Sequence, residues 1–173
     1  MKERETLGIY TFFPERSHYS AHIKFNVPII DLQRTILNLL YKLNGCKAEG
    51  SLLSLVEPNV EAFIEFGVAD GLVFNYLDVN TLDNLLKAIS GKILRVLDFL
   101  CIIRYYKVRS DKRVALRSDF FFLRFLFNND ELEIQVFHEK GLQRVSTKDL
   151  VKFLVERIRF GLMGRDRALS INK

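Results

Sequence analysis

Residues 119–138 read DFFFLRFLFNNDELEIQVFH, and this stretch decides the expected fold. Apolar side chains alternate with other residues on both sides of a central Asn-Asn-Asp, at Phe121, Leu123, Phe125 and Phe127 and again at Leu132, Ile134 and Val136. A period of two is typical of strands that bury one face. Asn and Asp tolerate the backbone angles of tight turns. The stretch therefore predicts two antiparallel strands joined at residues 128–130.

The same alternation recurs at 19–26 and at 60–67, which predicts two further half-buried strands. Asp70-Gly71 follows the second of these and precedes an apolar run at 72–77. Because Gly adopts positive φ at little cost, this dipeptide predicts a β-hairpin.

Further hairpin and strand signals lie near the start and the middle of the chain. Residues 14–17 predict the turn of a first hairpin, between strands at 7–13 and 19–25. Residues 93–100 fit either a helix or a strand, and the β-branched and aromatic residues from Phe99 onward favour a strand.

Three segments place apolar residues at helical spacing, and they predict helices at 29–43, from about Asn80, and at 147–160. Ser146 and Asp149 fit a capping box at the third helix, and Asn80 with Asp83 resembles one at the second. The sequence therefore predicts an α+β protein with about seven mainly antiparallel strands and three packed helices.

The three helix starts share the pattern Val-x-x-x-Asp, as VPIID at 27–31, VNTLD at 79–83 and VSTKD at 145–149. Each follows an expected hairpin, so the chain fits a set of repeated β-β-α units. The competing interpretation is convergence, because an acid in the first turn is general helix-start chemistry.

The length of 173 residues suits one globular domain over 1–162, or two packed subdomains at 1–92 and 93–162. Residues 163–173 are expected to form a flexible tail. No signal peptide or membrane-spanning run is visible, and Cys46 and Cys101 are too few for a disulfide framework. We therefore expect a cytoplasmic protein with unbridged cysteines and no membrane partner.

The sequence carries no signature of a known enzyme class. A P-loop, a G-x-S-x-G elbow and a paired Cys-x-x-Cys are all missing. His18 and His22 lack a third ligand, and neither Asp98 nor Asp119 has a second carboxylate nearby in sequence. We expect no cofactor, metal or catalytic residue, although a small hydrolase with a site assembled from distant residues stays open.

Positive charge is concentrated in one segment. The chain carries a formal net charge of +5, and residues 104–117 hold six basic residues against the single acid Asp111. The neighbouring strand at 119–127 is rich in Phe. Basic side chains meet phosphates and aromatic rings stack on bases, so this combination is typical of nucleic-acid binding.

The sequence thus favours a non-enzymatic binding or assembly module. The expected nucleic-acid-binding residues are Arg104, Tyr106, Lys107, Arg109, Lys112, Arg113, Arg117, Phe122 and Arg124. The alternative is a structural subunit that binds another protein, or a second copy of itself, through a Phe-rich surface. The exposed face of 119–127 distinguishes the two.

Overall fold

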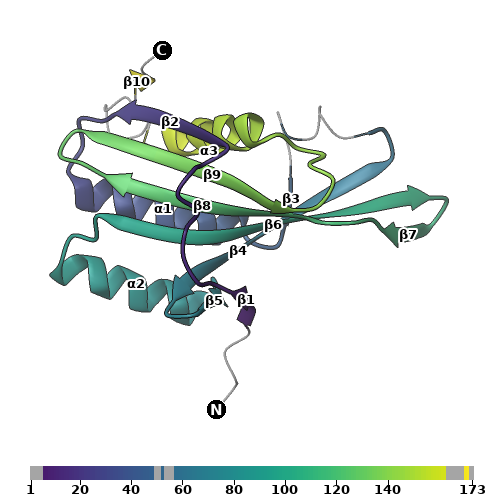
Figure 1. Cartoon of the computed structure of the whole chain (residues 1–173), viewed down its shortest axis with the longest axis horizontal. Helices are drawn as coiled ribbons and strands as arrows, with labels where there is room; N and C mark the ends of the chain where they lie inside the picture. Colours follow the sequence, from purple (N-terminus) through teal and green to yellow (C-terminus); the bar gives the residue numbers. More distant parts are fainter. Residues whose placement is uncertain (1–5, 49–51, 53–56, 163–169, 172–173) are drawn as a thin grey trace.

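A computed structural model describes residues 6–48, 52, 57–162 and 170–171 of the chain. In this part of the chain, three helices cover one face of a single ten-stranded sheet (Figure 1). The predicted α+β class is confirmed, with more strands than the seven expected. Most of the expected tail lies outside the described residues, and two of its residues form a short strand.

The chain runs β1 (Thr6–Ile9), β2 (Tyr19–Lys24), α1 (Ile29–Leu43), β3 (Cys46–Lys47), β4 (Val60–Asp70), β5 (Val73–Tyr76), α2 (Val79–Gly91), β6 (Val96–Arg109), β7 (Lys112–Ala115), β8 (Asp119–Phe127), β9 (Glu131–Lys140), α3 (Thr147–Leu162) and β10 (Ser170–Ile171). The strand order is β1-β5-β4-β6-β8-β9-β2-β10, with β3 beside β4 and β7 beside β6. The neighbouring strands are antiparallel, so the sheet shows the mainly antiparallel pairing that was predicted.

Local turn and cap chemistry explains the two confirmed hairpins and one of the helix starts. Gly71 has φ of 63° in the turn from β4 to β5. The amide of Asn128 donates to the carbonyl of Glu131 where β8 turns into β9. At α3, the amide of Asp149 donates to Ser146 Oγ, which in turn donates to the Asp149 carboxylate. The predicted cap at Ser146 is confirmed, and Asp149 accepts from the Ser146 hydroxyl.

The structure corrects two local predictions and decides the secondary structure of the ambiguous region. The predicted first hairpin is wrong, because β1 pairs with β5 whereas β2 pairs with β9 and β10. Residues 14–17 therefore belong to a long crossing and not to a hairpin turn. The second helix is capped by Asp78, whose side chain accepts from the amide of Thr81, and not by Asn80. The ambiguous region becomes strand from Val96 onward.

The connectivity bears on the proposed repeat. Strands β4 and β5 form a hairpin that leads into α2, and β8 with β9 forms one that leads into α3. The segment before α1 differs, since β1 and β2 lie in distant positions of the sheet. Duplication of β-β-α units stays a hypothesis that concerns the second and third units.

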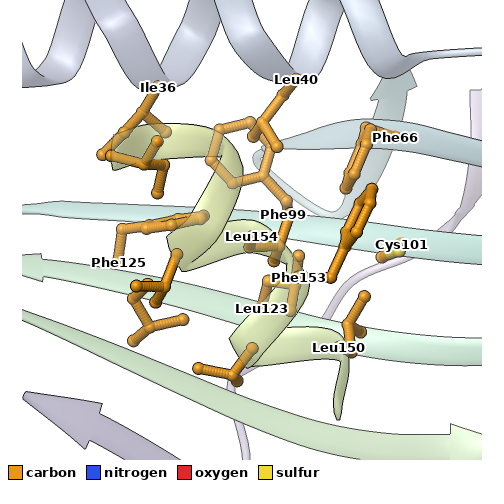
Figure 2. Packing of buried hydrophobic residues seen from close by; sticks show 14 of the residues in the cluster. Ile36, Leu40, Phe66, Phe99, Cys101, Leu123, Phe125, Leu150, Phe153 and Leu154 are labelled. Atoms are coloured by element: carbon orange, nitrogen blue, oxygen red, sulfur yellow. The ribbon is translucent and has the colours of Figure 1, made fainter. Parts of the chain in front are cut away.

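The main core lies between the helices and the central strands (Figure 2). Alternate residues of β6 and β8, including Phe99 and Phe125, are buried against Ile36 of α1 and Leu154 of α3. Burying a side chain of this size is worth about 1.5–3 kcal/mol, so this layer supplies much of the driving force for folding. The period-two pattern of β8 thus points one set of phenylalanines at the helices.

The opposite side of the sheet, called here the helix-free face, carries Phe63, Leu100, Ile102, Tyr106, Phe120, Phe122, Arg124 and Phe137. The segment between β1 and β2 crosses part of this face (Figure 1). Along the crossing, Tyr10 packs on Phe74 and Phe122, Phe13 lies over Arg124, and His18 stacks on Phe137. A second, smaller apolar cluster forms beneath it around Phe74, Leu100 and Ile102.

Candidate nucleic-acid interface

The basic segment predicted from the sequence forms a hairpin of β6 and β7 at one end of the molecule (Figure 1). Its cross-strand pairs run from Tyr106 with Ala115 to Arg109 with Lys112. The turn holds Ser110 at φ of 52° beside the exposed Asp111. Seven of the nine predicted residues, Arg104 to Arg117, therefore lie on this hairpin or at its base.

Two of the basic residues are neutralised by acids of β4. Arg104 Nε lies 3.0 Å from Glu65 Oε2, and Arg113 Nη2 lies 3.0 Å from Glu61 Oε2. Glu61 also pairs with Lys47 of β3, at 3.2 Å. Arg113 places its guanidinium over the ring of Phe63, 5.6 Å from the ring centre. These side chains are held in place by the sheet, and the two glutamates offset two of the three positive charges.

The other four cations differ in this respect. Lys107, Arg109, Lys112 and Arg117 form no ion pair with any residue that the structure describes. Arg109, Lys112 and Arg117 are exposed, and Lys107 is half-buried. We call these four residues the hairpin cations. Their charges face water, where they attract polyanions by long-range electrostatics.

The structure separates Phe122 and Arg124 from the hairpin. Both lie on β8, opposite Leu100 and Asp98 of β6, in the middle of the sheet. Arg124 holds Asp98 through two hydrogen bonds, from Nε at 2.7 Å and from Nη2 at 2.8 Å, and Tyr10 donates its hydroxyl hydrogen to the same carboxylate. Neither residue shares a surface with the hairpin cations.

These contacts change the ionisation of the groups that make them. The hydrogen bond to Asp98 raises the pKa of Arg124 above its usual range. Burial, and then the hydrogen bond to Asp98, raises the pKa of Tyr10. Asp98, which has no second carboxylate nearby in sequence, is therefore the centre of a Tyr-Asp-Arg network. Phe13 shields this network with its ring centre 4.5 Å from the Arg124 guanidinium carbon.

Asp119 is the residue whose importance the sequence did not reveal. It is fully buried and accepts hydrogen bonds from the Tyr105 hydroxyl at 2.7 Å and from the amides of Gln143 and Arg144 at 2.6 and 2.9 Å. His138 Nε2 lies 3.0 Å from Asp119 Oδ1, the oxygen that also accepts from the Gln143 amide. Burial, and then the bond to Asp119, raises the pKa of Tyr105. The cluster ties β6, β8, β9 and the loop before α3 together.

The remaining histidines have structural neighbours. His18 accepts a hydrogen bond from the amide of His138, and His22 lies against Glu131. Among the described residues, no three His, Cys, Asp or Glu side chains gather in a metal-binding group. Cys46 is exposed and Cys101 is buried, and both thiols are free, as predicted.

The described helices are all too short or too polar to cross a membrane. No protein-family model matches the chain, and the searches of curated proteins and solved structures gave no match either.

Proposed function

We propose that the protein binds nucleic acid through the hairpin of β6 and β7. The observation that carries this proposal is that the four hairpin cations meet no described acid, although the two arginines beside them do. A phosphate backbone supplies a regular row of negative charges for such side chains. Binding would release condensed counterions, which makes the affinity strongly dependent on salt.

The placement of acids on β4 supports the same conclusion. Glu61 and Glu65 neutralise Arg113 and Arg104 on the helix-free face, so that the free charge lies toward the turn and on the other face of the hairpin. The site thus has a defined position and not just a net charge. The two free cysteines suit a reducing compartment, and we assign the protein to the cytoplasm.

A second candidate, binding of another protein through a Phe-rich surface, gains less from the structure. Most phenylalanines are buried or half-buried, and the exposed ones are Phe12 and Phe160. These two belong to the crossing segment and to the end of α3. They do not form a Phe-rich patch on β8, which was the surface that the sequence suggested.

The test is a binding measurement by fluorescence anisotropy with labelled DNA and RNA at about 50 mM salt, where weak phosphate contacts still register. The variant carries Arg109→Gln, Lys112→Gln and Arg117→Gln. It should bind at least about tenfold more weakly and lower the salt slope by roughly one for each lost phosphate contact. These exposed side chains contribute little to stability, so the variant should fold normally.

A matched control removes the same charge from the helix layer, through Lys87→Gln, Lys148→Gln and Lys152→Gln, at positions that are also exposed. It should bind like the wild type. Absence of binding at micromolar protein, or equal weakening by both triple variants, would reject the hairpin as the site.

A further inference from the structure

We infer that the ligand is double-stranded DNA, with the hairpin lying in the major groove and its basic side chains contacting the phosphates. The alternative is a single strand whose bases stack on the sheet. This inference rests on the proposed function and specifies its substrate class. It follows from two observations: the state of the aromatic rings on the helix-free face, and the shape of the hairpin.

The aromatic rings of the helix-free face are already occupied by groups of the chain itself. The Arg113 guanidinium lies over Phe63, the Lys140 ammonium lies 4.2 Å from the ring centre of Phe120, and His18 stacks on Phe137 at 4.2 Å with an interplanar angle of 20°. Phe122 meets the edge of Tyr10 at 6.3 Å, and Tyr106 meets Phe63 edge-on at 5.6 Å. Base stacking needs open ring faces, and here it would have to displace these contacts.

The hairpin ends in a tip made of two strands only. The register of β4 with β6 ends at Val60 opposite Lys107, with a last hydrogen bond from the Val108 amide to the Asn59 carbonyl. Beyond this point the pair of Arg109 with Lys112 and the turn between them form a two-stranded tip, and Figure 1 shows β6 and β7 extending past the ends of β8 and β9. The major groove of B-form DNA, about 12 Å wide, admits a two-stranded ribbon of this kind. The major groove of an RNA duplex is too narrow for it.

The side chains of the hairpin alternate in a way that fits a groove. The face turned away from Glu61 carries Lys107 opposite Val114 and Arg109 opposite Lys112. Three cations thus surround one exposed apolar residue, Val114, with 52% of its surface accessible. Long basic side chains from both strands of the ribbon can reach the phosphates on both walls of a groove, whereas a single strand offers one row of phosphates.

The experiment compares a DNA duplex of about 20 base pairs, roughly two helical turns, with each of its single strands and with the RNA duplex of the same sequence. The protein is the full chain, and salt is held constant. We expect the DNA duplex to bind at least about tenfold tighter than the single strands or the RNA duplex. Of these ligands, only the DNA duplex has a major groove wide enough to admit a two-stranded ribbon. Equal or tighter binding of a single strand overturns the inference and leaves the proposed function intact.

Two substitutions test the geometry. Val114→Asp places an acid among the cations and should weaken duplex binding at least about tenfold, because it repels the phosphates. Val79→Asp introduces the same charge at a site of equal exposure, 52%, at the start of α2, and should leave binding unchanged. Phe63→Leu should also leave duplex affinity unchanged, whereas a stacking platform would lose about fivefold or more.

The outcomes separate the two claims. If no nucleic acid binds, the proposed function fails and the inference fails with it. If the hairpin triple variant abolishes binding but Val114→Asp does not weaken it, the hairpin binds nucleic acid without entering a groove. Loss of binding in Phe63→Leu with a normally folded protein would favour stacking and overturn the inference.

Discussion

Asp98 on β6 and Arg124 on β8 lie directly opposite each other on the helix-free face, joined by two hydrogen bonds of 2.7 and 2.8 Å. The Asp98 side chain is 11% exposed and that of Arg124 is 28% exposed. An ion pair with this little solvent is sensitive to the loss of one partner, since the other charge remains in a poorly hydrated position.

Arg124→Met should therefore lower the free energy of unfolding by about 2–4 kcal/mol, as removal of one partner of a partly buried pair does. The double variant Asp98→Leu with Arg124→Met should be more stable than Arg124→Met alone, because no unpaired carboxylate remains. Guanidinium denaturation of the three proteins measures both differences. A double variant that is no more stable than Arg124→Met would contradict the coupling.

Asp119→Asn should be more damaging than its small change in shape suggests. One amide oxygen cannot replace two carboxylate oxygens that accept from Tyr105, from two backbone amides and from His138. We expect a loss of about 3 kcal/mol or more, because buried donors are left unsatisfied. Asp111→Asn, at the exposed hairpin turn, is the control and should change stability by less than about 0.5 kcal/mol. Equal stability of the two variants would remove Asp119 from its structural role.

Gly141 tests the same cluster from the backbone side. Its φ is 114°, and an added Cβ would lie 2.5 Å from the Ser118 carbonyl oxygen and against the Asp119 carboxylate. Gly141→Ala should cost about 2 kcal/mol or more, through backbone strain and steric clash. Gly91→Ala, whose added Cβ would meet no side chain within 4 Å beyond its chain neighbours, should be neutral or gain up to about 1 kcal/mol. Thermal unfolding of both variants checks the contrast.

Stability should fall at alkaline pH. Burial raises the pKa of the Cys101 thiol, and burial with a hydrogen bond to Asp119 raises that of Tyr105. In each case the unfolded chain releases its proton at a lower pH than the folded chain. The free energy of unfolding is therefore unaffected below about pH 8 and decreases as pH rises past about 8.5 for Cys101 and about 10 for Tyr105.

The variant Cys101→Ala should start from a lower stability, yet lose less of it between about pH 8.5 and 10, where the cysteine of the unfolded chain ionises. Urea denaturation at a series of pH values gives the slope for both proteins. Parallel slopes would show that the buried thiol does not contribute to the alkaline loss.

The two thiols should also differ in reactivity. Cys46 is exposed at the short strand β3, whereas Cys101 is buried among core residues of β6. A thiol reagent should modify Cys46 rapidly in the native protein and Cys101 after unfolding, because reaction requires the accessible thiolate. Mass spectrometry after brief labelling identifies the modified site. Rapid labelling of Cys101 in the native state would contradict its placement in the core.

How much of this structure the sequence predicts depends on how local each signal is. The strand at 60–67, the helix at 147–160 and the Ser146 cap follow from periodicity and from contacts within a few residues, and all are confirmed. The first hairpin failed because nothing local shows that β2 prefers β9 to β1. Pairing between distant strands is decided by the complete sheet.

The candidate site shows the same division. Charge clustering located the hairpin cations, since a hairpin keeps neighbours in sequence together in space. Phe122 and Arg124 were added to the site because they are near in sequence, yet Tyr10 and Phe13 of the crossing segment cover them. The donors to Asp119 come from β6, β9 and the loop before α3. Because these segments are far apart in sequence, no residue spacing predicts the cluster.

The crossing segment also constrains how the chain can reach its native state. His22 of β2 lies against Glu131, 109 residues later in the chain, and His18 meets His138 after 120 residues. During synthesis, β2 therefore has to wait for β9 to be made, while the strands between them can already pair. Long separations of this kind slow folding, because the entropy of closing a long loop is lost before the stabilising contacts form. Until the crossing docks, Phe74, Leu100 and Phe122 are left uncovered, and in this interval a nascent chain would be most prone to aggregate or to bind a chaperone.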